Sequence, residues 1–192
     1  MKKKRIIVAA TGASGFPILE AVLKLLRQDG SLEVHLIVSG SAKLTMVHET
    51  GLTAEELGEY ADFVYQPDEI WAGPASGTFR TEGILIVPCS MKTVAGIHSG
   101  YAEDLILRAA DVTIKEQRTL VLAARETPLS AIHLKNLYEL SLLPGVRIIP
   151  PMMTFYHQPE NMEDMVYHMA AKLVEPFGVE AENYCRWTGG EI

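Results

Sequence analysis

The sequence predicts a doubly wound α/β domain, in which one parallel sheet is buried between two layers of helices. Short apolar runs alternate along the chain with stretches that repeat apolar residues at helical spacing, which is typical of parallel strands joined by helices. The run at 83–88 (GILIVP) is apolar throughout, as expected for a central strand buried on both faces. With 192 residues, 48% apolar and 21% charged, the chain is long enough for one such domain, and we expect residues 1–192 to form it.

The first unit of the expected fold is a strand at 6–10, a turn at 11–15 (TGASG) and a helix. The helix is indicated by apolar residues at the spacing of one helical face, Leu19, Val22, Leu23 and Leu26. Gly12 and Gly15 allow the backbone to turn sharply and to approach a ligand closely. Because a helix that starts directly after a strand points backbone N–H groups at an anion, the turn predicts a phosphate site. An ordinary strand-to-helix turn is the alternative.

Further strands and helices alternate through the rest of the chain. Strands are expected at 32–38, 63–65, 119–124 and 146–149, and helices at 42–50, at 102–110, after Pro128 and after Asn161. Pro128 suits the first turn of its helix, and Asn161 suits the N-cap of the last one. The first of these two helices is expected to bury Leu134, Leu137 and Tyr138, and the last one Met162, Met165, Val166, Met169 and Leu173. The segment 66–80, with two prolines and two glycines, predicts a long surface loop.

Small, hydroxyl and basic residues follow four of the expected strands. They are the segments 11–15 (TGASG), 38–41 (VSGS), 88–93 (PCSMKT) and 125–128 (RETP). Ligands of open parallel sheets bind at the carboxyl ends of the strands, so we expect these segments to meet at one site. Their side chains suit a phosphate and a polar heteroaromatic ring, which favours a nucleotide-type cofactor over a bare scaffold.

The opening turn also resembles that of NAD(P)-dependent short-chain dehydrogenases and epimerases. Two features count against a nicotinamide enzyme. The second strand ends at Ser39, where an acidic residue would hold the adenosine ribose. A Tyr-x-x-x-Lys pair is absent from the sequence, since Tyr167 and Lys172 are one residue too far apart. A nicotinamide cofactor is therefore the minority hypothesis.

Composition argues against nucleic-acid binding and a membrane span, and it favours a cytoplasmic location. A net charge of −7 argues against a dedicated nucleic-acid binder, and no apolar stretch reaches the length of a membrane span. Cys89 and Cys185 lack metal-ligand spacing and are too few for a disulfide framework, so we expect a cytoplasmic protein. Cys89 is expected to be a core residue, and His133, within a helix, a packed or capping residue.

Six motifs occur in order along almost the whole chain: TGASG at 11–15, PCSMKT at 88–93, SGYAEDLILRAADV at 99–112, KEQRTLVLAARETPLSAIHLKNL at 115–137, FYHQP at 155–159 and RWTGG at 186–190. Together they resemble the flavin prenyltransferase family, the UbiX-like proteins, which include one of the components of hydroxyarylic acid decarboxylase systems. The combination of PCSMKT, RETPLS and FYHQP is specific, whereas the glycine turn alone is not. The resemblance implies a three-layer, flavodoxin/Rossmann-like fold that binds FMN. It also implies a homo-oligomer, with a dodecamer as one candidate, and sites at subunit interfaces.

By this resemblance the protein transfers a dimethylallyl group from dimethylallyl phosphate to reduced FMN without a metal, and a partner decarboxylase receives the prenylated FMN. The positions that match the family's flavin contacts are Gly12, Ala13, Ser14, Ser39, Ser90, Met91, Lys92, Thr93 and Arg125. Tyr156 and Lys172 match positions that hold the prenyl phosphate, and Arg186 is a further candidate there. Glu49 is the candidate for an acidic residue near the reacting flavin, so the expected catalytic residues are Glu49, Tyr156 and Lys172. The sequence leaves open whether the donor is a mono- or a diphosphate.

One departure and two alternatives remain. Many relatives carry a glutamate in the turn before the last strand, where this chain has LLPG at 142–145, and nearby Glu139 is expected to face elsewhere. A flavin-dependent cysteine decarboxylase shares the fold and cofactor, but its Pro-Ala-Ser-Ala-Asn-Thr and Pro-x-Met-Asn motifs differ from PCSMKT and from PPMM at 150–153. The second alternative is a non-catalytic carrier protein that binds FMN and passes it to a decarboxylase.

Overall fold

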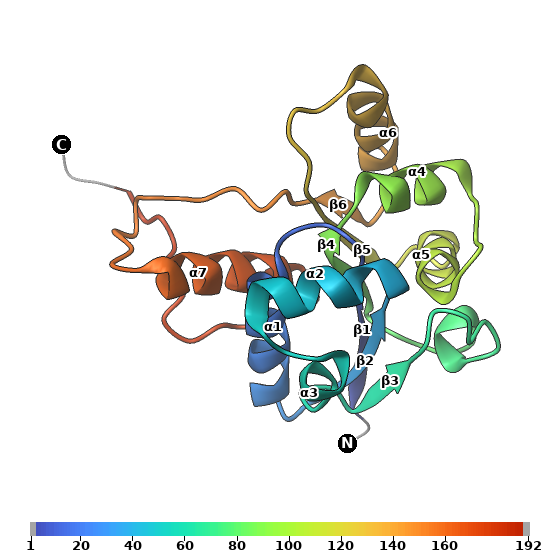
Figure 1. Cartoon of the computed structure of the whole chain (residues 1–192), viewed down its shortest axis with the longest axis horizontal. Coiled ribbons are helices and arrows are strands. Elements are labelled where there is room, and N and C mark those ends of the chain that lie inside the picture. Colours follow the sequence, from blue (N-terminus) through green and yellow to red (C-terminus); the bar gives the residue numbers. More distant parts are fainter. Residues whose placement is uncertain (1–2, 190–192) are drawn as a thin grey trace.

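The structure is a computed structural model and describes residues 3–189. Within that range the chain forms a six-stranded sheet of order β3-β2-β1-β4-β5-β6, and all neighbouring strands are parallel (Figure 1). The strands are β1 (Lys4–Ala10), β2 (Leu32–Val38), β3 (Phe63–Tyr65), β4 (Gly83–Cys89), β5 (Thr119–Ala124) and β6 (Val146–Ile148). The order runs outward in both directions from β1 and β4, which confirms the doubly wound sheet.

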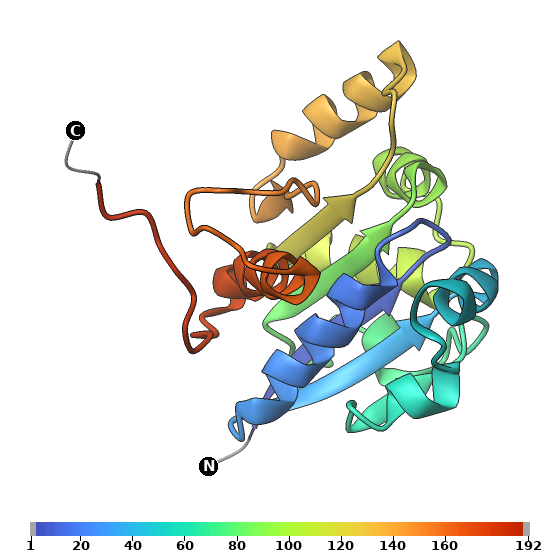
Figure 2. The same cartoon turned by 60° about the vertical axis from the view of Figure 1, so that its left-hand side comes forward.

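Helices cover both faces of this sheet. They are α1 (Phe16–Gln28), α2 (Gly40–Thr50), α3 (Ala54–Gly58), α4 (Met91–Ser99), α5 (Leu105–Lys115), α6 (Ala131–Ser141) and α7 (Met162–Val174), with short 3-10 segments η1 (Gly73–Ala75) and η2 (Glu175–Phe177). Helices α1 and α7 pack on one face, and α4 and α5 pack on the other (Figure 2). The sheet is therefore the middle of three layers, as the sequence predicts.

The two central strands show how the core is divided. Along β1, Ile6 and Val8 belong to the core on one face and Ile7 to the core on the other, because side chains alternate along a strand. All residues of β4 are buried, which confirms the central strand expected from its unbroken apolar run. Gly83 opens β4 with φ +147°, and a Cβ there would lie 1.9 Å from the Thr119 carbonyl oxygen. Only glycine fits this position without a shift of the backbone.

The region after β4 differs from the sequence prediction. PCSMKT contains the start of a helix as well as a turn, since α4 begins at Met91 with Ser90 as its N-cap. The next helix begins after Asp104 and not at 102, because the Asp104 side chain accepts a hydrogen bond from the Leu107 N–H and caps the helix there.

The helix after Pro128 also starts later than predicted. Helix α6 begins at Ala131, so Pro128 precedes the helix and does not form its first turn. Ser130 and His133 form a capping box, in which each side chain accepts a backbone hydrogen bond from the other residue. This contact confirms His133 as a capping residue and explains why the helix starts where it does.

The expected apolar side of α6 is only partly confirmed, since Leu137 is half-buried and packs against the core but its two predicted neighbours do not. The exposed fraction is 54% for Leu134 and 65% for Tyr138, whereas Leu140 is buried. Asn161 caps α7 as expected, with its side chain accepting a backbone hydrogen bond of 2.9 Å. Met162 is exposed, however, so α7 buries its apolar residues only farther along the helix. In both helices, apolar side chains that were expected to be buried lie on the surface: Leu134 and Tyr138 of α6 and Met162 of α7.

The remaining expectations concern one loop and one cysteine. Segment 66–80 is largely irregular, with η1 as its only regular turn, and Trp71 is exposed on it. Cys89 is fully buried and burial raises the pKa of its thiol, which confirms it as a core residue. Within residues 3–189, no helix combines the length and the apolar character needed to cross a membrane.

His35 is a buried titratable residue on β2. Its Nε2 lies 3.0 Å from a Glu33 carboxylate oxygen and its Nδ1 lies 3.0 Å from the Tyr65 hydroxyl, while the Phe63 ring stacks on the imidazole. Burial lowers the pKa of His35, and this effect outweighs the opposite influence of Glu33. The folded protein therefore keeps His35 neutral at a pH where an unfolded chain would already protonate it.

We expect this histidine to make the protein less stable in mild acid. The unfolded chain takes up the proton first, so the free energy of unfolding falls as the pH drops below about 6.5, by at most about 1.4 kcal/mol per pH unit for one group. Urea unfolding at several pH values should give a shallower pH dependence for His35→Gln than for the wild type. His48→Gln, at an exposed position on α2, is the control and should keep the wild-type dependence. Equal pH dependence in all three proteins would contradict this assignment.

Candidate functional site

Four loops lie at the carboxyl-end edge of the sheet, around the point where the strand order reverses. They follow β1, β2, β4 and β5. The Ser39 N–H donates to the Ala10 carbonyl (2.9 Å) and the Arg125 N–H donates to the Cys89 carbonyl (3.0 Å), so these loops are joined to the ends of neighbouring strands. Sheets of this strand order have their ligand crevice at this edge. We call the predicted site residues on these loops and in the first turn of α4 the strand-end set: Gly12, Ala13, Ser14, Ser39, Ser90, Met91, Lys92, Thr93 and Arg125.

Thr11 fastens the two central loops together. Its hydroxyl donates to the Pro88 carbonyl (3.1 Å) and accepts from the Ser90 N–H (2.8 Å), and the side chain is buried. Pro88 lies near the end of β4 and Ser90 directly follows the strand, so both partners are far from Thr11 in the sequence. The hydroxyl therefore fixes the glycine turn relative to the start of α4.

Removing this hydroxyl is expected to destabilise the protein. Thr11→Val keeps the shape of the side chain but leaves the Ser90 N–H without its acceptor, while the Pro88 carbonyl keeps the backbone N–H of residue 11 as a donor. The orphaned N–H should lower the free energy of unfolding by about 1–3 kcal/mol. Thr11→Ser keeps the hydroxyl and is the matched control, with a smaller expected loss. Denaturant unfolding of both variants measures the difference. A Thr11→Val protein as stable as Thr11→Ser would show that the hydroxyl does not hold the loops.

The N-terminus of α1 binds a carboxylate of the same chain. One oxygen of Glu49 accepts hydrogen bonds from the backbone N–H groups of Gly15 and Phe16, each at 2.9 Å. Burial raises the pKa of Glu49, but the Ser14 hydroxyl, these two N–H groups and the positive charge of Arg125 outweigh it and bring the pKa below its usual range. In this structure, Glu49 therefore accepts from the N–H groups at the start of α1 where the sequence predicts a phosphate.

The N-terminus of α2 offers a better anion site. Ser39 is its N-cap but makes no side-chain capping bond, and its hydroxyl lies 3.2 Å from that of Ser41. A Cβ on Gly12 would lie 2.7 Å from Ser41 Oγ, so the glycine allows the turn to sit directly against these hydroxyls. Two hydroxyls beside uncapped N–H groups, with no acidic residue in the first turn, fit a phosphate. Ser41 is missed by the motif comparison, although its spacing from Ser39 is visible in the sequence.

The residues of the PCSMKT motif divide into buried and exposed side chains. Ser90 caps α4 by accepting from the Thr93 N–H (3.4 Å), and the two hydroxyls lie 3.1 Å apart. The side chains of Met91 and Thr93 are buried, so at Met91 only the backbone is available to a polar group. Lys92 is exposed, with its ammonium 4.0 Å from a Glu103 carboxylate oxygen. Lys92 therefore supplies an exposed positive charge at this loop.

A second cluster of polar side chains lies on α7 and on the segments before and after this helix. Lys172 Nζ lies 2.7 Å from one oxygen of Glu175, and the Arg186 guanidinium lies 3.2 Å from the other. The hydrogen bond with Glu175 raises the pKa of Lys172 despite its partial burial. Tyr156 Oη lies 3.2 Å from His168 Nε2. We call Tyr156, Lys172 and Arg186 the C-terminal set.

Two partners of the C-terminal set are absent from the sequence prediction. Glu175 follows Lys172 by three positions, and His168 precedes it by four, which places all three near one another along the helix. Helical spacing is therefore a signal that could have identified them. The match to the family's motifs, by contrast, identifies only Lys172, Arg186 and Tyr156.

The two sets are separate within one chain. Among the contacts between residues 3–189, no side-chain hydrogen bond or ion pair links Glu49 or the strand-end set with the C-terminal set. Each set instead has its own internal partners. The described part of the chain thus presents two separate polar clusters of different character.

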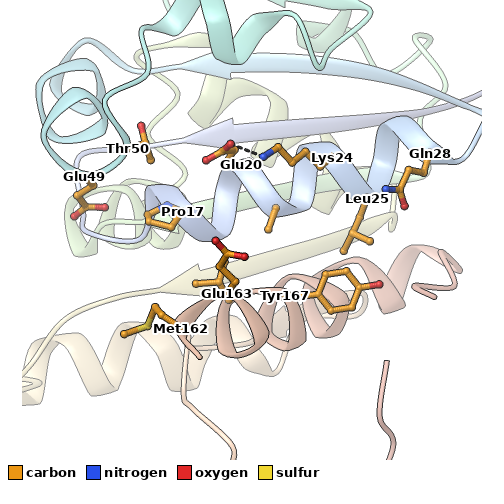
Figure 3. Close-up of a pocket in the computed structure, with 12 residues that line it drawn as sticks. Pro17, Glu20, Lys24, Leu25, Gln28, Glu49, Thr50, Met162, Glu163 and Tyr167 are labelled. Carbon is orange, nitrogen blue, oxygen red and sulfur yellow. Dashed lines mark ion pairs between the residues drawn. The ribbon is translucent and has the colours of Figure 1, made fainter. Parts of the chain in front are cut away.

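A groove of about 600 Å³ runs between α1 and α7 (Figure 3). Glu49 lies at the end of the groove where Met162 begins α7, and Tyr167 lies farther along it. Glu20 and Lys24 form an ion pair of 2.6 Å on its α1 side. Of the predicted site residues, only Glu49 lines this groove, so the groove is adjacent to the strand-end edge and distinct from it.

In many relatives, the turn before the last strand carries a glutamate, and here this turn is LLPG at 142–145. Neither the strand-end set nor the C-terminal set contains a carboxylate that could replace that glutamate. Residues 142–145 are exposed before β6. Glu139 on α6 pairs with His98 of α4 and, at 3.9 Å, with Lys135. Glu139 therefore contacts neither the strand-end set nor the C-terminal set, as expected from the sequence.

Comparison with known proteins identifies the family. A family model described as Flavoprotein matches residues 1–174. A probable UbiX-like flavin prenyltransferase of Streptomyces sp. (strain D7) is 48% identical over 185 residues, which cover 96% of this chain and 92% of the relative. The chain belongs to the UbiX-like flavin prenyltransferase family. This membership confirms the family resemblance seen in the motifs, and it makes the chain a flavoprotein of the transferase class.

Solved structures of UbiX-like proteins have the same fold. AnUbiX (PadA1), solved in complex with FMN and dimethylallyl pyrophosphate, is 42% identical, with a TM-score of 0.95 over 99% of this chain and 100% of that one. A dodecameric FMN-dependent UbiX-like decarboxylase from Escherichia coli O157:H7 is 46% identical, with a TM-score of 0.94 over 96% of this chain and 100% of that one. AnUbiX thus binds FMN with this fold, and the Escherichia coli protein is a dodecamer.

Proposed function

We propose that this chain transfers the dimethylallyl group of dimethylallyl phosphate to reduced FMN, giving prenylated FMN for a partner aromatic-acid decarboxylase. The observation that carries the proposal is the pair of separate polar clusters, one suited to a flavin phosphate and the other to a second phosphate. A simple flavin carrier has no need of the second. The AnUbiX complex, which holds FMN and a prenyl diphosphate together, supports the same assignment.

The strand-end set is proposed to hold FMN. The uncapped start of α2, with Ser39 and Ser41, suits the flavin phosphate, and Arg125 offers a planar fork to a flavin acceptor atom. The other proposed flavin contacts are Gly12, Ala13, Ser14, Ser90, Met91, Lys92 and Thr93. When bound, reduced FMN supplies the nucleophilic N5 and the C6 position that complete the new ring. Glu49 is proposed to hold the loop at 12–15 through its bonds to the Gly15 and Phe16 N–H groups, and to attract Arg125 by its negative charge.

The C-terminal set is proposed to bind the prenyl phosphate. Lys172 and Arg186 bring positive charge to the leaving oxygens, and Tyr156 adds a hydroxyl donor. These groups stabilise the negative charge that develops as the carbon–oxygen bond of the donor breaks. Glu175 holds both cations in place, and the phosphate takes over from it as their anionic partner. The reaction needs no metal in this scheme, because the cations of the protein neutralise the phosphate.

A homo-oligomer is proposed to bring the two polar clusters together. Apolar side chains are exposed on α6 and in the segment after β6, among them Ile132, Tyr138, Met152 and Phe155. A surface of this kind is typical of subunit interfaces. In the proposed assembly, for which the dodecamer of the Escherichia coli relative is the candidate form, the C-terminal set of one copy faces the strand-end set of another. We propose a cytoplasmic location, in keeping with two unpaired cysteines.

Anaerobic incubation of the purified protein with reduced FMN and a prenyl donor tests the reaction. With dimethylallyl phosphate we expect a flavin heavier by one C5H8 unit, together with an equal amount of inorganic phosphate. Dimethylallyl diphosphate, assayed in parallel, identifies the preferred donor. Recovery of unmodified FMN would support the carrier hypothesis instead. Decarboxylation of a peptide with a C-terminal cysteine would support the cysteine decarboxylase hypothesis.

A further inference from the structure

The hydroxyl of Tyr156 lies within hydrogen-bond distance of a buried histidine, His168. Its Oη lies 3.2 Å from His168 Nε2 and 3.3 Å from the Cys185 carbonyl oxygen. The Tyr156 side chain is substantially exposed, whereas only 5% of His168 is exposed. The phenol therefore reaches the surface while its hydrogen-bond partner belongs to the packed interior.

His168 is itself fixed in orientation. The His157 ring stacks on it with a centroid distance of 4.0 Å and an interplanar angle of 8°, and the Tyr184 ring lies 4.8 Å away. Burial lowers the pKa of His168, and the charges of His157 and Lys172 lower it further. A neutral imidazole held in this way presents one N–H donor and one acceptor in fixed directions.

The single proton of the Tyr156 hydroxyl determines which neutral tautomer of His168 allows the tyrosine to donate to a phosphate. A phenol has a single proton to donate, so Tyr156 can donate to a phosphate only if that proton is not given to the histidine. When Nε2 of His168 carries the hydrogen, it donates to Oη and leaves the phenol proton free. The neutral Cys185 carbonyl then competes for this proton with the phosphate, and the charged acceptor forms the stronger bond.

We propose that His168 is a positioning residue, which donates its Nε2–H to Tyr156 and thereby directs the tyrosine O–H at the phosphate of the prenyl donor. This inference rests on the proposed function, because it takes that phosphate as the ligand of Tyr156. It adds a residue that works through another side chain and does not touch the donor itself.

A matched pair of variants tests the role of Nε2. The amide of His168→Gln extends to the position of Nε2, whereas the amide of His168→Asn reaches only the position of Nδ1. Calorimetric titration of the FMN-loaded protein with dimethylallyl phosphate should show affinity within about twofold of the wild type for His168→Gln, and a loss of about three- to tenfold for His168→Asn. The KM for the donor should change in parallel, while FMN affinity stays at the wild-type value.

Tyr156→Phe separates positioning from a general packing effect. If His168 acts through the tyrosine hydroxyl, His168→Asn should cause no further loss of donor affinity in the Tyr156→Phe background. Additive losses would overturn the proposal, because they would mean that His168 supports the site independently of that hydroxyl. Should His168→Asn fail to fold, the nitrogen chemical shifts of isotopically labelled His168 in the wild type decide. A hydrogen on Nε2 supports the proposal, and a hydrogen on Nδ1 overturns it.

The outcomes distinguish this inference from the proposed function. Wild-type protein that binds and uses dimethylallyl phosphate, with an unchanged His168→Asn variant, would overturn the role of His168 alone. Wild-type FMN-loaded protein that neither binds nor uses the donor would overturn the proposed function, and the inference with it.

Discussion

Lys172→Ala is expected to lower kcat/KM for dimethylallyl phosphate by about 10- to 100-fold, since a hydrogen bond from a charged group contributes about 1.5–3 kcal/mol. The loss should fall mainly on the KM for the donor, because Lys172 belongs to the C-terminal set, pairs with Glu175 and contacts no member of the strand-end set. FMN affinity should not change. Steady-state kinetics with varied donor, together with a fluorescence titration of FMN, measures both quantities.

Lys115→Ala is the matched control for this variant. Lys115 is a surface lysine that also pairs with a neighbouring glutamate, but it ends α5 on the opposite face of the sheet from α7. Its removal should leave donor kinetics unchanged. Wild-type prenylation by Lys172→Ala at low donor concentration would show that this lysine does not bind the phosphate.

Glu49→Gln is expected to give the opposite kinetic pattern. It should reduce kcat by about tenfold or more while the donor KM stays within about twofold, because the neutral amide no longer holds Arg125 by charge. The same change weakens the bonds to the start of α1 and should lower the free energy of unfolding by about 1 kcal/mol. Single-turnover prenylation and denaturant unfolding measure the two effects.

Glu163→Gln provides the control for Glu49. Glu163 lines the same groove from α7, but none of its side-chain contacts within the described chain reaches the start of α1. It should keep wild-type turnover and stability. A Glu49→Gln protein with the turnover of Glu163→Gln would mean that the Glu49 carboxylate has no part in the reaction.

The sheet was accessible from the sequence because its information is local. Each strand is a short apolar run, and the unbroken run of β4 identifies the centre of the sheet directly. The start of α4 was less accessible, since PCSMKT joins strand end, cap and first helical turn without an apolar period. Helix α6 misled for a different reason. Leu134 and Tyr138 have helical spacing with Leu137, but they face outward while Leu137 and Leu140 face the core of the same chain.

From the sequence, the candidate site could be proposed as a set of residues but not as an arrangement in space. Motif matches identified Arg125, Tyr156 and Lys172, whose residue types fit anion binding. The bond from Gly15 to Glu49 spans 34 positions, and no spacing rule links such distant residues. Ordinary phosphate turns and carboxylate-capped turns also share the same local sequence, so only the fold reveals that Glu49 takes the N–H groups of α1.

Complementation between two variants tests most directly whether the reaction site is shared between two copies of the chain. Arg125→Ala damages the strand-end set and Lys172→Ala damages the C-terminal set, so assemblies of either variant alone should have little activity at donor concentrations below the wild-type KM. Co-expressed in equal amounts, the two variants should form mixed assemblies with about one quarter of the wild-type prenylation rate, because random pairing leaves that share of interfaces with both sets intact. Mixed assemblies as inactive as the separate variants would place both sets of a working site on one chain and contradict the account.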